Sequence, residues 1–158
     1  MAALLLWLFS LGAFFFSSNA QELPETYRKG VDLALENLHA LPRIQKLHVF
    51  LRSVSKSEHE LGFDVTFIYH HFLLKPTTCE KGTDDPSACH VRENRPLMDC
   101  TVCYRTYGGE IEPDPKPYAH CIPKPALTEE MKAERLDHCN KMGYSRGSAV
   151  LLGSKGNE

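Results

Sequence analysis

The stretch DCTVCYRTY, residues 99–107, decides the fold, because it combines the pattern of a β-strand with two cysteines. Its Thr, Val and Tyr residues are typical of strands, and Gly108 and Gly109 end it. Cys100 and Cys103 are three positions apart, so on a strand their side chains point to opposite faces of the sheet. We therefore expect these two cysteines to have different partners.

All six cysteines lie in one part of the chain, at positions 79, 89, 100, 103, 121 and 139. An even, clustered set predicts a disulfide framework formed outside the cytosol. Cys79 and Cys89 bracket the turn-like sequence KGTDDP, so we expect them to pair locally. A hairpin between residues 99–107 and 118–122, joined by a proline-rich stretch, would place Cys100 opposite Cys121 and leave Cys103 for Cys139. The C-x-x-C spacing of Cys100 and Cys103 also occurs in redox and zinc sites, but a redox pair needs a helix N-terminus, so structural disulfides fit better.

The N-terminus has the layout of a secretory signal peptide. Residues 2–16 are apolar except for Ser10, and the small residues Ser18 and Ala20 precede a predicted cut after Ala20. The alternative is a membrane anchor, but the apolar run is too short for a comfortable span. We expect residues 1–20 to be removed, the mature protein to be secreted and extracellular, and no stable membrane insertion.

The remaining pattern predicts an α+β domain. Residues 24–39 carry an apolar stripe at helical spacing, and Pro42 prevents the helix from continuing. Residues 45–54 and 63–74 alternate like strands, and the polar residues 55–60 with Gly62 are typical of a turn between them. Residues 128–140 predict a short helix with Thr128 as its N-cap.

No motif indicates an enzyme, a metal site or a cofactor. The sequence has no nucleophile elbow, phosphate-binding glycine loop or H-E-x-x-H helix, and Asp84-Asp85 is more simply a turn. His70 and His71 are adjacent, so on a strand they face opposite sides of the sheet and do not easily share one ion. The net charge of −2 gives no general attraction to nucleic acid.

Several stretches of this sequence resemble the chemerin family. ELPETYRKGV at 22–31 and ALENLH at 34–39 are similar to the first helix of the chemerins, and TC at 78–79, CHVR at 89–92, CTVC at 100–103, HC at 120–121 and Cys139 are similar to chemerin cysteines in order and spacing. The resemblance implies a cystatin-like fold, with an N-terminal helix packed on an antiparallel sheet, three disulfides in the C-terminal half and a flexible C-terminal tail. The family's cysteine pairing agrees with Cys79–Cys89, Cys100–Cys121 and Cys103–Cys139.

The resemblance also implies a function. Chemerins are secreted precursors whose C-terminus is trimmed by extracellular serine proteases. The trimmed protein is a ligand of a G-protein-coupled receptor and acts in chemotaxis, inflammation and adipocyte differentiation. We accordingly expect a monomeric cystatin-like domain over residues 21–140 and a processed tail over residues 141–158.

The tail contains the candidate receptor-binding and processing residues. Its glycines and serines favour flexibility. The receptor-binding candidates are Tyr144, Gly147, Val150, Leu151 and Leu152. Arg146 and Lys155 are candidate trypsin-type cleavage points. Chemerin tails are rich in aromatic residues, whereas this tail has only Tyr144, and aromatic anchors usually dominate binding energy.

Two alternatives remain on the same fold. A cathelicidin-like antimicrobial precursor would release a cationic peptide, but the tail has three basic side chains and one acidic one, a net of only +2, and cathelicidins have four cysteines. A cystatin-type cysteine-protease inhibitor would use a Q-x-V-x-G hairpin. At the corresponding hairpin this chain has RSVSK, residues 52–56, which keeps only the valine.

Overall fold

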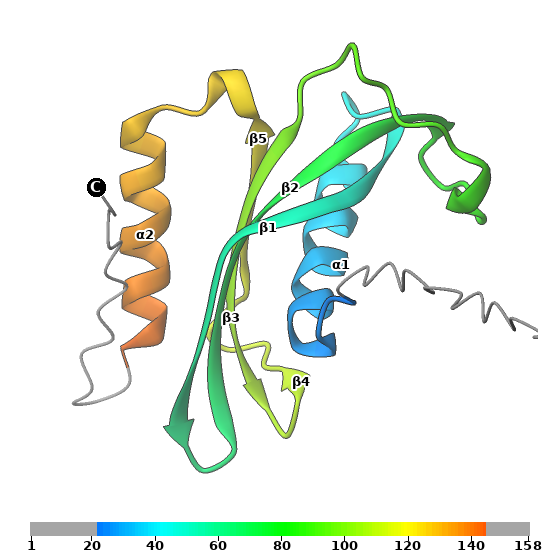
Figure 1. The fold of residues 1–158 in the computed structure, drawn as a ribbon. Helices are drawn as coiled ribbons and strands as arrows, with labels where there is room; N and C mark the ends of the chain where they lie inside the picture. The colour runs from blue at the N-terminus through cyan, green and yellow to red at the C-terminus, as the bar shows by residue number, and fades with distance from the viewer. Residues whose placement is uncertain (1–21, 145–158) are drawn as a thin grey trace, which may run out of the picture.

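The computed structural model describes residues 22–144, and residues 1–21 and 145–158 lie outside the described part. A five-stranded antiparallel sheet forms the middle layer, and one helix covers each of its faces (Figure 1). Helix α1 (Glu25–Ala40) lies on one face and helix α2 (Glu129–Gly143) on the other. The predicted α+β class, with an N-terminal helix packed on an antiparallel sheet, is confirmed. No helix of residues 22–144 has both the length and the apolar composition needed to cross a membrane.

Strand β3 (Met98–Tyr107), which contains the two cysteines of the opening stretch, lies in the interior of the sheet. One of its edges pairs with β2 (Val65–Glu80), which in turn pairs with the edge strand β1 (Lys46–Gly62). Its other edge pairs with β5 (Tyr118–Pro123) along most of its length and with the short β4 (Glu110–Ile111) at its end. The predicted hairpin is confirmed, since Cys100 and Cys121 are register partners.

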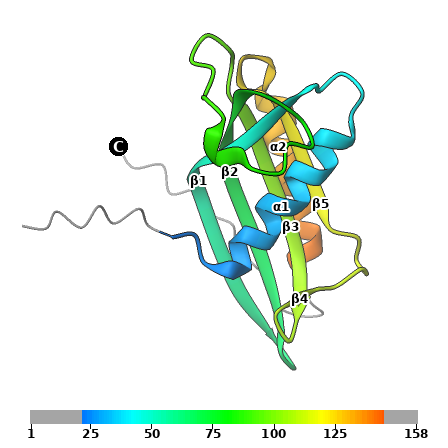
Figure 2. The ribbon, with the colours of Figure 1, turned by 90° about the vertical axis from the view of Figure 1, so that its right-hand side faces the viewer.

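Helix α1 forms because its apolar residues recur every three or four positions. Pro24 precedes it, and its buried stripe consists of Tyr27, Gly30, Val31, Ala34 and Leu38. This stripe packs on the inward side chains of the sheet. Figure 2 shows that α1 runs across the strands. The larger of the two apolar cores therefore lies between α1 and the sheet.

Gly30 has a specific packing role that helix propensity does not reveal. A Cβ atom at this position would lie 2.7 Å from Cε1 of Tyr104 and 2.9 Å from Cγ2 of Val102, which is closer than carbon atoms approach without repulsion. The hydroxyl of Tyr104 also donates a hydrogen bond to the carbonyl oxygen of Thr26. Gly30 thus allows α1 to lie directly on β3.

We expect Gly30→Ala to destabilise the protein, although alanine favours helices more than glycine does. Overpacking a tight contact costs about 1–3 kcal/mol, whereas the gain in helix propensity is about 1 kcal/mol. Urea unfolding should therefore show a lower midpoint for the variant. The matched control is Asn37→Ala on the same helix. If the midpoint of Gly30→Ala equals or exceeds that of the native protein, the packing argument is wrong.

The two faces of the sheet have separate cores because side chains alternate along each strand. On β2, Ile68, Phe72 and Leu74 face α1, whereas Phe67 faces α2. Cys100 lies in the α1 core and Cys103 in the α2 core, as their spacing predicts. Helix α2 begins at the predicted N-cap, where the hydroxyl of Thr128 accepts a hydrogen bond from the amide of Met131 at 3.2 Å.

The predicted turn at residues 55–60 is wrong. These residues continue strand β1, and the turn lies beyond them at Gly62, Phe63 and Asp64, all of which have positive φ angles. Ser57, His59 and Leu61 are half-buried, whereas Lys56, Glu58 and Glu60 between them are exposed. The segment therefore has the two-residue period of a strand. The sequence does not reveal this period, because the half-buried and the exposed residues are both mostly polar. Phe63, expected at the start of a strand, is instead 98% exposed in the turn.

The course of β1 also argues against the protease-inhibitor hypothesis. Residues 52–56 lie inside β1, where Arg52, Ser53, Ser55 and Lys56 pair with β2 and the register shifts at Val54, so they do not form a hairpin loop. A cystatin-type inhibitor inserts such a loop into the protease cleft, and a strand interior does not present one. Residues 52–56 therefore do not form the loop that the cystatin-type mechanism requires.

Candidate functional site

The candidate functional site is the junction between the folded domain and the C-terminal tail, at the end of α2. Tyr144 is the last residue that the structure describes, and its amide donates a hydrogen bond to the carbonyl oxygen of Asn140 at 3.0 Å. Its side chain is half exposed. The last described residue before the tail therefore lies at the surface, at the end of a helix.

The last turn of α2 is fastened to the sheet by several contacts. Cys139 is joined to Cys103 of β3, and Met142 packs in the same small core as Phe67. Gly143 lies against the same ring, since a Cβ atom there would be 3.2 Å from Cε1 of Phe67. The end of α2 thus has a well-defined position on the sheet.

Arg105 of β3 completes this attachment from the sheet. Its Nε and Nη2 donate hydrogen bonds to the carbonyl oxygen of Met142 at 3.1 and 2.7 Å, and Nη2 also reaches the carbonyl oxygen of Tyr144 at 3.3 Å. The final carbonyl groups of a helix have no partner within the helix, and the negative end of the helix dipole attracts a cation. Arg105 therefore acts as a cap supplied by a distant strand.

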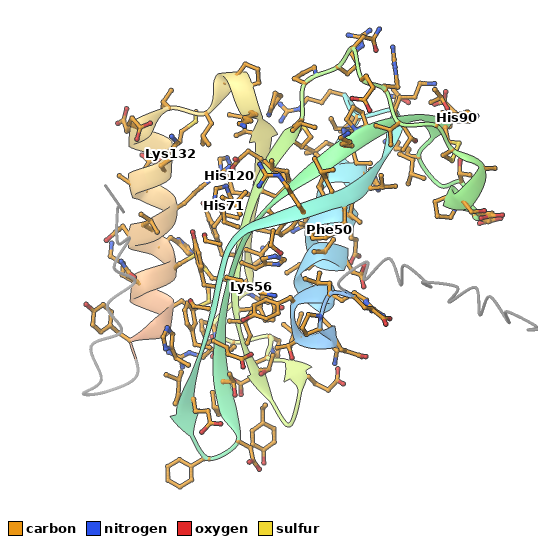
Figure 3. All side chains as sticks on the ribbon, in the orientation of Figure 1. Phe50, Lys56, His71, His90, His120 and Lys132 are labelled. Carbon is orange, nitrogen blue, oxygen red and sulfur yellow. A yellow bond between two sulfur atoms is a disulfide. The ribbon has the colours of Figure 1, made fainter. Side chains whose placement is uncertain are left out.

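A buried polar cluster holds the middle of α2. Arg135 is 3% exposed, and its Nη1 donates to the carboxylate of Asp99 at 2.6 Å while its Nε donates to Nδ1 of His120 at 2.8 Å. Nε2 of His71 lies 2.9 Å from the same carboxylate. His71 and His120 both lie between the sheet and α2 (Figure 3). Arg135 thus links α2 to β3 and β5, and the carboxylate of Asp99 extends the cluster to His71 of β2.

The electrostatics of the cluster favour a charged Asp99–Arg135 pair. Burial alone raises the pKa of Asp99, but hydrogen bonds from His71 and Arg135 and their charges outweigh it and hold the pKa below its ordinary value. Burial, together with the positive charge of Arg135, lowers the pKa of His120. At neutral pH Asp99 is therefore ionised and His120 is neutral.

The six predicted cysteines are all joined in the structure. Cys79 bonds to Cys89, Cys100 to Cys121 and Cys103 to Cys139, with Cα–Cα distances of 5.6, 4.2 and 5.7 Å. The first pair closes the turn-like loop, the second crosses the β3–β5 hairpin, and the third joins β3 to α2. Disulfides of this kind persist in oxidising, extracellular compartments.

Most of the predicted tail and processing residues fall outside the described part of the chain. These are Ala20, Arg146, Gly147, Val150, Leu151, Leu152 and Lys155. Residues 141–143, which the sequence assigns to the tail, belong to α2. The helix continues because Met142 and Gly143 pack against Phe67, a contact that does not show in their local sequence.

The adjacent histidines lie on opposite faces of the sheet, as predicted. The ring of His70 is 5.2 Å from that of Tyr27 of α1, whereas His71 contacts Asp99 beneath α2. Within residues 22–144, no three His, Cys, Asp or Glu side chains gather into a potential metal site.

Sequence reasoning missed Arg105, Arg135 and Asp99. Arginine and aspartate are seldom fully buried, and nothing in the polar sequence of α2 distinguishes Arg135 from its exposed neighbours. The one available signal was weak. Asp99 stands at the head of a strand whose neighbours are apolar or small, where an isolated carboxylate needs a partner.

Comparison with known proteins supports the resemblance seen in the sequence. Retinoic acid receptor responder protein 2 of Cricetulus griseus is 26% identical over 144 residues, which cover 90% of this chain and 82% of that protein. The same protein of Mus musculus is 29% identical over 116 residues, covering 73% of this chain and 65% of the relative. That of Homo sapiens is 30% identical over 103 residues, covering 65% and 59%. In the last two alignments, the chain spans less than two thirds of the relative's length.

No protein-family model matches the chain. Among solved structures, the crystal structure of Al-CPI is similar, with a TM-score of 0.43 and 17% identity over 65% of this chain and 88% of that chain. The sequence of this chain is thus similar to that of retinoic acid receptor responder protein 2, or chemerin, along most of its length.

Proposed function

We propose that this protein is a secreted chemerin-like precursor that C-terminal proteolysis converts into a ligand of a G-protein-coupled receptor. The observation that carries the proposal is the similarity to retinoic acid receptor responder protein 2 along most of the chain. As a chemoattractant and adipokine, it would act in chemotaxis, inflammation and adipocyte differentiation. The extracellular serine proteases that trim it and the receptor that binds it are its partners in this proposal.

The architecture is compatible with activation by cleavage. The α-helices and strands that the structure describes, and the three disulfides, lie before residue 145, and Arg146 and Lys155 follow. A cut at either site therefore removes no element of the described fold. Because α2 is fastened to the sheet as far as Met142, trimming would leave the new C-terminus attached to an intact domain.

The two candidate cuts have different consequences. Cleavage after Lys155 retains the apolar residues Val150, Leu151 and Leu152, whereas cleavage after Arg146 removes them. A receptor cavity that buries an apolar tail gains binding energy from these residues. We therefore propose cleavage after Lys155 as the activating event and cleavage after Arg146 as an inactivating one.

We expect the protein trimmed after Lys155 to mobilise calcium in cells that bear a chemerin receptor, and the protein trimmed after Arg146 to be inactive. The full-length chain with Lys155→Gln is the matched control for protease action, because it resists cleavage at this residue. Calcium release should be measured for all three with purified, correctly oxidised protein. Silence of every trimmed form, or equal activity of both, would overturn the proposal.

A further inference from the structure

A cavity between α1 and β5 is not used by the proposed function. It has a volume of about 460 Å³, within the range of about 300–1,000 Å³ that is typical of small-molecule sites. Figure 2 shows α1 lying alongside β5, and the cavity lies where the end of this helix meets the strand. It is on the opposite side of the sheet from α2 and the tail junction.

The cavity has an apolar wall. Leu38 of α1 is 2% exposed and belongs to the main core, while Leu41 and Ala119 pack against that core from the edge. These residues come from the end of α1, the following loop and β5. An aliphatic chain could lie against them and remove apolar surface from water.

Two free cations stand at the same cavity. Arg43 follows α1 and Lys116 precedes β5, and neither makes an ion pair or hydrogen bond within residues 22–144. No acidic side chain is among the described residues that line the cavity. Its charge is therefore positive and uncompensated.

His120 also borders the cavity, but its ring does not face a ligand there. Side chains alternate along β5, so Ala119 and Cys121 pack toward α1, whereas the ring of His120 lies on the α2 face, where its Nδ1 accepts a hydrogen bond from Arg135. The polar groups available to a ligand on the α1 face are therefore Arg43 and Lys116.

We propose that this cavity binds a small carboxylate that bears an aliphatic chain. The carboxylate would accept hydrogen bonds from Arg43 and Lys116, and the chain would cover Leu41 and Ala119. Charge-assisted hydrogen bonds to guanidinium are strong and directional, which favours a planar carboxylate. This site is independent of receptor activation, so either proposal can fail alone.

Acetate, butanoate, hexanoate and octanoate, titrated into the ¹⁵N-labelled full chain, test the proposal by NMR. We expect amide shifts around Ala119 and Leu41 and affinity that increases up to about fourfold for each added methylene until the cavity is filled. Hexylamine and hexanol, which have the same chain without the anion, should bind far more weakly. Equal binding of acetate and octanoate, equal binding of hexylamine, or shifts located elsewhere would overturn the proposal.

Variants identify the groups involved. Arg43→Gln and Lys116→Gln should each weaken hexanoate binding about tenfold, as expected for loss of a charge-assisted bond. Lys124→Gln is the matched control, since Lys124 is also exposed and unpaired within residues 22–144 but lines a different hollow. Ala119→Leu should narrow the cavity and abolish the preference for the longer chains. An equal loss in Lys124→Gln would show general attraction to surface charge and exclude the site.

Discussion

Arg135→Leu is expected to lower the free energy of unfolding by about 3 kcal/mol at neutral pH. Leucine fits a buried position, but it leaves the carboxylate of Asp99, which is 3% exposed, with only the hydrogen bond from His71. Removing one member of a buried ion pair costs about 3–5 kcal/mol, because the other charge stays buried without compensation. Urea unfolding followed by circular dichroism measures the loss.

Two controls separate this effect from a general weakening of α2. Lys132→Ala on the same helix removes an exposed ion pair with Glu129 and should change stability by about 1 kcal/mol or less. The double variant Asp99→Leu/Arg135→Leu should recover much of the loss, since two apolar residues replace the pair. If the double variant is less stable than Arg135→Leu, the buried-charge explanation is wrong.

The pH dependence of the same variant gives a further readout of the Arg135→Leu prediction. In the native protein the pKa of Asp99 is held below its ordinary value, so the pair stabilises the fold above the pKa of the unfolded state and loses this effect as the pH falls. Without Arg135 the folded carboxyl group protonates more readily. The difference in stability between native protein and variant should therefore shrink on acidification, and a constant difference would contradict the argument.

Loss of the Cys103–Cys139 bond is expected to have the largest effect of the three disulfides. Its cysteines are 36 residues apart, and the chain-entropy relation for closing such a loop gives about 4 kcal/mol. Both cysteines are fully buried in the core that holds α2. The variant Cys103→Ala/Cys139→Ala should unfold at a lower urea concentration and exchange its α2 amides faster than the rest of the protein.

The matched control is Cys79→Ala/Cys89→Ala. This bond closes a loop with a separation of only 10 residues, for which the same relation gives about 3 kcal/mol, and it lies away from α2. Its removal should leave hydrogen exchange in α2 unchanged. Faster α2 exchange in the control would mean that the helix depends on overall stability, and not on its own disulfide.

Several elements followed from their local sequence because one kind of side chain repeats at one period. The stripe of α1, the alternation of β3 and the hydroxyl of Thr128 are each legible within a few residues. The opposite directions of Cys100 and Cys103, and of His70 and His71, follow from strand geometry alone. The second half of β1 has the same two-residue period, but there both the half-buried and the exposed residues are mostly polar. The prediction of a turn was wrong for this reason.

The candidate site followed from the sequence only in part. The cysteine spacing and the composition of the tail are visible in the sequence, but the attachment of the helix end is not. Arg105 is 37 residues from Met142 and 39 from Tyr144, whose carbonyl groups it caps. No local pattern encodes such a contact, because its energy depends on which strand lies beneath the helix.

By itself, the sequence determined the α+β class, the helices and most strands, and the faces on which the central cysteines lie, since these depend on backbone periodicity. Only the tertiary structure decided that α2 covers the second face of the sheet, that the helix extends to Gly143, and that Asp99, Arg135, His71 and His120 meet beneath it. Burying charged groups is favourable only when partners from distant strands surround them. Such partners exist only after the chain has folded.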